Sequence, residues 1–261
     1  MNLELWQLGL ILLGGVAGGL LNALAGGGTF LSFPALLLAG IGPVSANATN
    51  AVALWPASLS TAWALRHNLR SLNWRRYLRP LLLAAASGGL LGGVLLLLIS
   101  DQAFYQLIPW LLLLATLLFT ASGRIANLLQ RWSQRQPDLQ RLSRRGWLGQ
   151  WLVSVYGGFF GAGMGILMIA SLAISGHTRM QEINAIKSLL SSVIYSVAAI
   201  TFMLAGAVHW LALLCMLPGS LLGGYCGGLL ARRISNRALR VLVILVGWLL
   251  TLFYFWQVYV D

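Results

Sequence analysis

The sequence predicts an all-α membrane protein that crosses the bilayer many times. Its 261 residues are 59% hydrophobic and only 8% charged, whereas about a quarter of the residues in a soluble domain are charged. Apolar runs of about 20 residues, the length that crosses a hydrocarbon core of roughly 30 Å, recur along the whole chain. These runs leave no room for a soluble domain, so we expect a single transmembrane domain over residues 1–261.

The first half of the chain is expected to form a broken helical hairpin followed by three spanning helices. Glycines at 26–28 interrupt the first apolar run, and the apolar piece that follows them is too short to cross a bilayer alone, at about 1.5 Å of helix per residue. Three full-length runs come next. The expected elements are 5–25, 29–40, 44–66, 80–99 and 104–123.

The second half repeats this plan after a basic loop at 124–146. Shifting the sequence by 165 − 28 = 137 places Gly28 on Gly165 and Asn50 on Lys187, the only lysine of the protein. Paired glycines at 88–93 recur at 223–228, and their spacing of four favours close helix packing. We therefore expect two repeats, 5–123 and 147–260. The elements of the second are 147–162, a short piece to 175, 180–206, 209–231 and 240–260.

The arginines indicate how each broken segment lies in the membrane. They cluster at 66–79, 124–145 and 232–240, and basic residues mark the cytoplasmic side of a membrane protein. If each broken segment crossed once, the first and last clusters would lie on opposite faces. If each segment is a hairpin, all three clusters share one face and both termini lie on the other. The hairpin gives each half five membrane elements, an odd number, so the repeats are expected to be inverted.

The formal charge of +12 does not indicate a nucleic-acid-binding protein. The arginine clusters lie between hydrophobic runs, where they match anionic lipid headgroups instead. We expect the lipid bilayer as a partner and no nucleic acid, and the sequence leaves a homodimer open.

Backbone groups at the glycine breaks are the first candidates for a binding site. A break in a membrane helix leaves N–H groups without partners, which requires protein, water or a ligand to satisfy them. Helix N-termini favour anions. The alternative is that the glycines only permit a turn and close packing. The predicted solute-binding residues are Gly26, Gly27, Gly28, Thr29, Asn47, Asn50, Gly163, Gly165, Asn184 and Lys187.

Lys187 is the sharpest of these candidates, because it stands inside an apolar run. A lysine at the centre of a membrane helix costs about 2.5–3.5 kcal/mol on insertion scales. Asn184 precedes it by three residues, and a broad polar face continues with Ser188, Ser191 and Tyr195. This pattern favours a lined cavity. The alternative is a side chain that reaches back to the cytoplasmic interface.

Catalytic, metal and cofactor sites are not expected. The five acidic residues fall near the ends of runs or in loops, and the three histidines are scattered singly. Glu182 is either a coupling group or a favourable charge at a helix start. The glycines at 26–28 lack the lysine and hydroxyl residue of a phosphate-binding loop. We therefore expect a protein that is not an enzyme.

The glycine breaks and the polar residues after them resemble the TauE/SafE family of membrane permeases. The resemblance rests on Gly26-Gly27-Gly28-Thr29 with Pro34, on Ala46 to Asn50, and on the weaker copy at 161–165 and 184–187. It implies a secondary transporter in the bacterial inner membrane that exports sulfite or an organosulfonate. The arginine placement, in turn, predicts that both termini face the periplasm. Ser171 replaces Pro34 in the second copy, and Ile186 and Lys187 replace its usual small and hydroxyl residues, so the exact solute stays open.

From the residues alone, the solute is small and anionic. The backbone of the glycine breaks would donate hydrogen bonds, the asparagines would add side-chain bonds, and Lys187 would supply the compensating charge. Two alternatives stay open: a passive anion channel, and a membrane-embedded enzyme or assembly factor. The coupling ion, the direction of flux and the oligomeric state also stay open.

Overall fold

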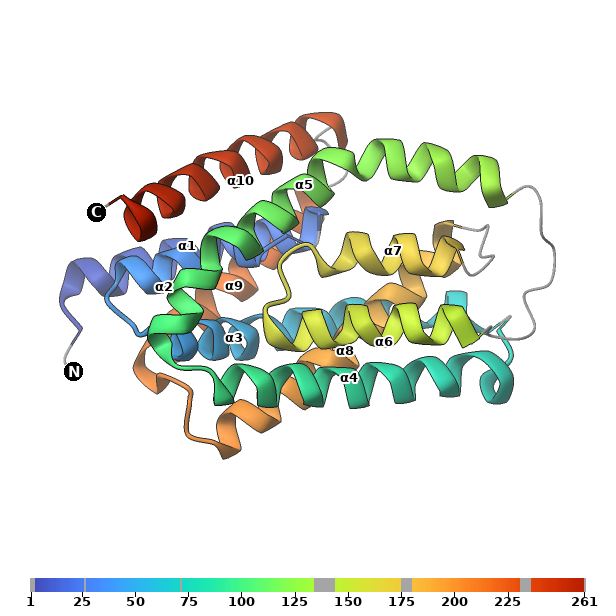
Figure 1. Cartoon of the computed structure of the whole chain (residues 1–261), viewed down its shortest axis with the longest axis horizontal. Coiled ribbons are helices and arrows are strands. Elements are labelled where there is room, and N and C mark those ends of the chain that lie inside the picture. Colours follow the sequence, from blue (N-terminus) through green and yellow to red (C-terminus); the bar gives the residue numbers. More distant parts are fainter. Residues whose placement is uncertain are drawn as a thin grey trace.

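The computed structural model describes residues 3–25, 27–70, 72–133, 144–174, 180–230 and 236–260. Within these ranges the chain is helical and contains no strand, and the helices run side by side along the long axis of the molecule (Figure 1). The α-helices are α1 (Leu5–Ala25), α2 (Thr29–Leu38), α3 (Pro43–Leu65), α4 (Arg79–Leu98), α5 (Asp101–Ser133), α6 (Arg144–Phe159), α7 (Met164–Ile174), α8 (Met180–Leu204), α9 (Trp210–Leu230) and α10 (Asn236–Tyr259). A 3₁₀ turn (Arg66–Leu69) and a π turn (Trp74–Leu78) connect α3 to α4.

The predicted fold class is confirmed: the chain is a polytopic α-helical membrane protein. Among the described residues, six helices are long and apolar enough to cross a membrane, namely α1, α4, α5, α8, α9 and α10. Large apolar side chains such as Leu98, Leu204 and Leu249 are more than two-thirds exposed in the isolated chain. Extensive apolar surface of this kind marks a face that lipid or another protein covers.

Two short helices complete hairpins with the helices that precede them. α1 runs from the end of the molecule where both termini lie, and α2 returns toward that end; α6 starts at the opposite end, and α7 returns there (Figure 1). With 10 residues α2 is about 15 Å long, half of a hydrocarbon core. Both broken segments therefore turn back, which is the hairpin alternative of the sequence.

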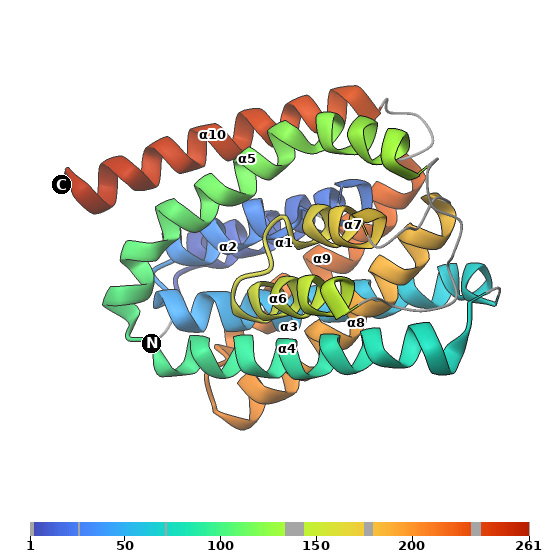
Figure 2. The ribbon, with the colours of Figure 1, turned by 45° about the vertical axis from the view of Figure 1, so that its right-hand side comes forward.

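The two halves of the chain exchange equivalent contacts. α1 packs on α9, and α6, which has the same place in the second half, packs on α4. α2 contacts α10, and its counterpart α7 contacts α5. The counterparts α3 and α8 pack on each other, and so do the counterparts α5 and α10. α5 and α10 run together along one flank in both views (Figures 1 and 2). This arrangement is the one expected of two inverted repeats, whose boundaries at 5–123 and 147–260 stay a prediction.

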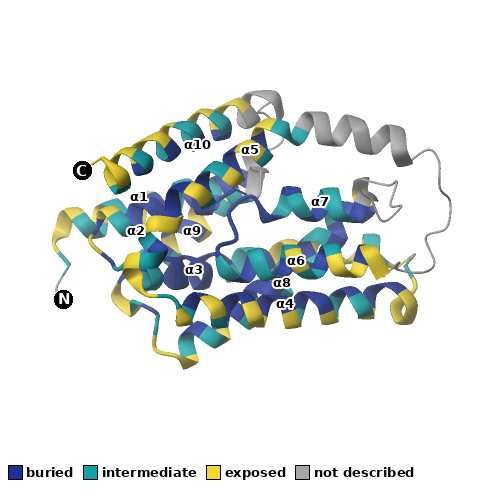
Figure 3. Ribbon diagram, viewed as in Figure 1, coloured by how far each residue is buried: buried dark blue, intermediate teal, exposed yellow. Residues whose placement is uncertain are grey.

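The first half of α3 is buried in the bundle, although α3 is not among the six apolar spans. Every residue from Ala46 to Leu54 is buried, including Asn47, Thr49 and Asn50, and Figure 3 shows this helix dark between its neighbours. A helix covered by protein on all sides can carry polar side chains, because they find partners inside the bundle.

The paired glycines serve close packing of helices. A methyl group on Gly92 of α4 would collide with the Val155 carbonyl oxygen of α6. A methyl group on Gly223 of α9 would likewise collide with the Val16 carbonyl oxygen of α1. These contacts confirm the predicted role of the four-residue glycine spacing.

The expected loop at 124–146 is partly wrong. α5 continues to Ser133 instead of ending at 123, and α6 begins at Arg144 instead of 147. The charged residues after 123 exclude this segment from a bilayer core, but they do not prevent helix formation in water.

Described arginines gather at one end of the bundle. Arg66, Arg70 and Arg79 lie at the junction of α3 and α4, and Arg144 and Arg145 begin α6 at the same end (Figure 1). Glu4, Asp101 and His209 lie at the other end, beside the starts of α1, α5 and α9. The positive-inside rule predicts that the arginine end faces the cytoplasm.

This orientation predicts the outcome of cysteine labelling. In a variant without Cys215 and Cys226, a cysteine at the exposed Ser100 should react with an impermeant maleimide in spheroplasts, and a cysteine at the exposed Arg70 should react only after lysis. Labelling of position 70 in intact spheroplasts would contradict both the cytoplasmic arginine end and the periplasmic termini.

Candidate solute-binding site

A small cavity surrounds Lys187 where α1, α3, α7 and α8 meet. Its volume is about 60 Å³, and we call it the lysine cavity. It lies in the half of the bundle toward the arginine end, because Lys187 stands seven residues after the start of α8 at that end. The residues that line it are Asn22, Ser58, Thr61, Met164, Gly165, Lys187, Ser188, Ser191 and Tyr195.

Among the residues that the structure describes, Lys187 is the only charged one in this lining. Its side chain is half-buried, and within the described part of the chain it makes neither a hydrogen bond nor an ion pair. A membrane lysine that snorkels would place its ammonium in water beyond the helix end, whereas this side chain borders an internal cavity. The position leaves the ammonium as a hydrogen-bond donor without a protein acceptor.

The start of α7 adds backbone donors to the same cavity. The turn before α7 reverses the chain through Gly161 and Gly163, whose φ angles of 80° and 73° are in the left-handed region that suits glycine. The first helical residues after it, Met164 and Gly165, line the cavity. The Gly165 N–H has no hydrogen-bond partner in the described ranges. The positive end of an 11-residue helix thus faces the lysine.

Gly165 leaves the lysine cavity open. A methyl group there would lie 3.6 Å from Lys187 Cδ and touch nothing else within 4 Å. Its φ angle is not in the left-handed region, so neither packing nor backbone conformation requires a glycine. The absent side chain gives a solute access to the backbone N–H.

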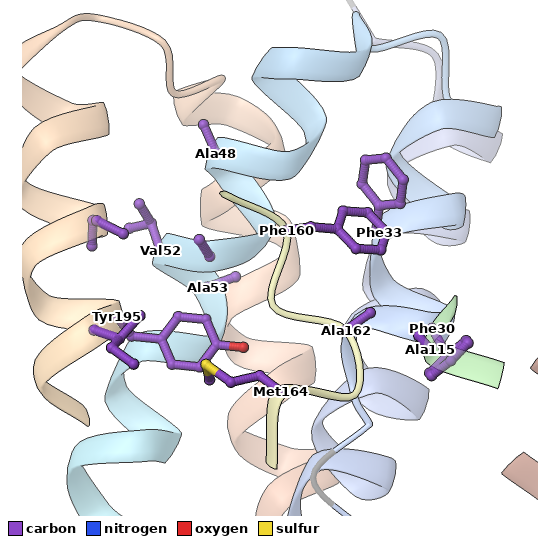
Figure 4. Packing of buried hydrophobic residues seen from close by; sticks show 14 of the residues in the cluster. Phe30, Phe33, Ala48, Val52, Ala53, Ala115, Phe160, Ala162, Met164 and Tyr195 are labelled. Atoms are coloured by element: carbon purple, nitrogen blue, oxygen red, sulfur yellow. The ribbon is translucent and has the colours of Figure 1, made fainter. Parts of the chain in front are cut away.

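Tyr195 connects the cavity to the first hairpin. Its ring is buried, and its hydroxyl points toward the α6–α7 connection near Met164 (Figure 4). Tyr195 is hydrogen-bonded to Thr29 at the start of α2. Asn50 donates through Nδ2 to Thr29 Oγ1 at 3.4 Å and accepts from Ser32 Oγ, which also bonds the Gly28 carbonyl oxygen at 2.9 Å. The network fixes the hairpin tip against α3 and α8.

The predicted site residues divide into three groups. Gly165 and Lys187 line the cavity, and Thr29 and Asn50 lie behind it through Tyr195. The others do not line it: Gly27 faces Phe119, Gly28 faces Gly18 and Asn22, and Gly163 faces Ala115. Asn47 Nδ2 donates to the Phe159 carbonyl oxygen at 2.7 Å, and Asn184 is half-buried one helical turn before Lys187. Gly26 lies outside the described residues.

Three cavity residues were missed by the sequence reasoning, namely Asn22, Ser58 and Thr61. Ser58 and Thr61 follow Asn50 on α3 at intervals of eight and three, so the helical period could have found them. Asn22 gave only the weak signal of a single amide in an apolar run.

Aromatic rings seal the side of the hairpin tips that faces away from the arginine end. Phe33 of α2 meets Phe160 edge to face at 5.5 Å, and Phe104 of α5 meets Phe159 in the same way at 5.6 Å. Figure 4 shows Phe33 and Phe160 beside the α6–α7 connection, with Tyr195 across from them. A second cavity of about 430 Å³, lined by Asp101, Gln102 and Tyr254 among others, lies beyond the rings.

Comparison with known proteins identifies related transporters. The family described as sulfite exporter TauE/SafE matches residues 10–254. A "Probable membrane transporter protein" of Haemophilus influenzae is 26% identical over 96% of this chain and 95% of its own length. The "Probable membrane transporter protein YfcA" of Escherichia coli K12 is 25% identical over 92% and 86%, and a "Probable membrane transporter protein" of Xylella fastidiosa is 28% identical over 90% of both chains. No solved structure matches the chain.

Proposed function

The chain belongs to the sulfite exporter TauE/SafE family of membrane transporters, and from this premise we propose that it is a secondary transporter that exports a small anion across the bacterial inner membrane. The proposed solute is sulfite or an organosulfonate, and the lysine cavity is its binding site. The observation that carries the proposal is Lys187, which has no partner and is the only charge among the described residues that line a cavity between the two hairpins.

The donors around the cavity suit an anion. An ammonium group, the Gly165 N–H at the start of α7 and the Ser188 hydroxyl border one space. The hydroxyls of Ser58 and Ser191 border it as well, and they donate to the Trp55 carbonyl oxygen and to Met168 Sδ. Charge-assisted bonds of this kind are roughly twice as strong as neutral ones. No carboxylate of the described part of the chain lines the cavity, so a cation would meet the repulsion of Lys187 without a compensating negative charge.

The position of the cavity suits binding of a solute from the cytoplasm. It lies toward the arginine end, which the positive-inside rule assigns to the cytoplasm. The Phe33–Phe160 and Phe104–Phe159 ring pairs lie between the cavity and the opposite end. A solute would bind there and leave after the hairpins move apart, as in other inverted-repeat transporters.

Flux measured in proteoliposomes tests this function. We expect purified protein to move sulfite or ethanesulfonate at a rate that a proton or sodium gradient changes, whereas empty liposomes show no such flux. A rate that no second-ion gradient alters would identify the passive channel instead. The absence of any anion flux, with no thermal stabilisation of the protein by these anions, would contradict the proposal.

A further inference from the structure

A third cavity adjoins the lysine cavity, between α1, α3 and α9. Its volume is about 220 Å³, and it shares Asn22 and Thr61 with the lysine cavity. We call it the side cavity. The residues that line it are Gly19, Asn22, Ala57, Ser60, Thr61, Ser220, Leu221, Gly224 and Tyr225. Because Asn22 and Thr61 line both cavities, the two cavities are neighbours.

The two compartments differ in charge. Lys187 gives the lysine cavity one positive charge, whereas the side cavity has neither a basic nor an acidic residue among the described residues of its lining. The polar side chains of its described lining are the Asn22 amide and the hydroxyls of Ser60, Thr61, Ser220 and Tyr225, and Ser220 already donates to the Ala53 carbonyl oxygen at 3.0 Å. The remaining lining is small or apolar. Such a space accepts an uncharged group and disfavours a second ionised one.

Gly224 supports a role for the side cavity beyond packing. Its neighbour Gly223 cannot carry a methyl group, because the Val16 carbonyl oxygen occupies the space. At Gly224 the nearest atom to such a methyl group would be Gly19 O, at 4.0 Å. A glycine inside a helix costs roughly 0.5–1 kcal/mol relative to alanine, and here neither a close contact nor a positive φ explains it. Its effect is to keep the side cavity open.

We propose that the transported solute is a monoanion with a short uncharged tail. This inference rests on the proposed function and names the solute class of the same site. The anionic head binds at Lys187 and the Gly165 N–H, and the tail passes Asn22 and Thr61 into the side cavity. A bare oxyanion leaves the side cavity empty. A dianion or a zwitterion brings there a charge that no residue of its lining compensates.

A series of alkyl sulfonates tests the tail. Binding to the purified protein is measured by calorimetry for methane-, ethane- and propanesulfonate, with sulfoacetate as the dianion and taurine as the zwitterion. We expect the dissociation constant to fall up to about fourfold for each added CH₂, the factor that corresponds to about 0.8 kcal/mol per buried CH₂. Sulfoacetate and taurine should bind more weakly than propanesulfonate. Equal affinity along the series, or tighter binding of sulfoacetate or taurine, would overturn the proposal.

A pair of glycine variants locates the tail. Gly224→Val fills the side cavity, so it should remove the gain from ethane- to propanesulfonate while leaving methanesulfonate nearly unchanged. Gly9→Val is the matched control, because Gly9 of α1 also has nothing within 4 Å of an added methyl group and lines neither cavity. The dissociation constants of Gly9→Val for the three alkyl sulfonates should equal those of the wild type.

The two proposals fail in different ways. If Lys187→Ala weakens binding of every sulfonate but Gly224→Val changes none, the lysine cavity is the site and the side cavity is filled by lipid, which overturns only the tail. If no sulfonate binds to the wild type, the proposed function itself fails. If Gly224→Val loses the increase in affinity with chain length while Gly9→Val keeps it, the result supports binding of the tail in the side cavity.

Discussion

Lys187→Ala is expected to lower the affinity for the transported anion by about tenfold to a hundredfold, the range that corresponds to the roughly 1.5–3 kcal/mol of a hydrogen bond to a charged group. The variant removes the only charge in the lining of the lysine cavity. The remaining donors are neutral hydroxyls, an amide and the start of α7. Transport should fall with binding, since no other cation in the lining replaces the ammonium.

Two further variants separate the charge from its shape. Lys187→Arg keeps the charge but should restore binding only in part, because a flat guanidinium cannot replace a compact ammonium in a cavity of about 60 Å³. Arg75→Ala is the control, since it also removes one positive charge but from the exposed connection between α3 and α4. It should bind the anion as the wild type does. If Lys187→Ala binds and transports normally in the same assays, the lysine is an interface residue and the site assignment is wrong.

Lys187→Ala should not destabilise the protein. In the structure Lys187 has no hydrogen bond or ion pair within the described ranges, so its removal breaks no contact of that kind, and insertion scales predict a gain. The midpoint of thermal unfolding without anion should therefore stay equal or rise. Stabilisation of the protein by added anion should decrease, which distinguishes a binding residue from a structural one.

The hairpins were predictable because two independent signals agreed. Glycines interrupt the apolar runs at both 26–28 and 161–165, and the arginine clusters share one face only if both segments turn back. The structure confirms the reversal at both places. Helix bounds followed from the apolar runs to within about four residues, as at the start of α6 and of α10, except at the end of α5, where the segment after 123 is helical outside the apolar stretch.

The site was predictable only where the repeat pointed to it. Aligning the halves placed Lys187 on Asn50 and Gly165 on the glycine break at Gly28, and Lys187 and Gly165 both line the cavity. The same alignment suggested Asn47, whose amide instead holds the Phe159 carbonyl oxygen at the end of α6. Whether an amide faces a cavity or a backbone oxygen depends on which helices meet around α3. That arrangement is a long-range property that local spacing does not contain.

Local spacing also could not predict that Asn22 lines the cavity. The sequence of α1 has no repeating pattern of polar residues around Asn22. Asn22 reaches the cavity because α1 packs closely against α2 and α9. That crossing depends on glycines: methyl groups on Gly18 and Gly19 would collide with Ser32 and Ser220. Close approach of backbones thus brings an amide from α1 into a space formed by α3, α7 and α8.

Gly28→Leu is expected to abolish transport while the protein still inserts into the membrane. Gly28 has helical backbone angles, so the glycine is not needed for a left-handed turn. Space is the reason for it: a methyl group there would collide with the Gly18 carbonyl oxygen and lie 2.8 Å from Asn22 Cβ. A leucine would push the tip of the first hairpin away from α1 and displace Asn22, which lines both the lysine cavity and the side cavity.

The size of the side chain should set the size of the defect. Gly28→Ala should already destabilise the protein by about 1–3 kcal/mol, as overpacking does in close-packed interiors, and lower transport in part. Gly9→Leu is the control on the same hairpin: that residue is exposed, and an added methyl group meets nothing within 4 Å, so transport should stay at the wild-type level. Protein level in the membrane, unfolding midpoint and flux are measured for all three. Wild-type flux in Gly28→Leu would show that the first hairpin tip yields without disturbing Asn22, and that the glycine break at 26–28 has no part in transport.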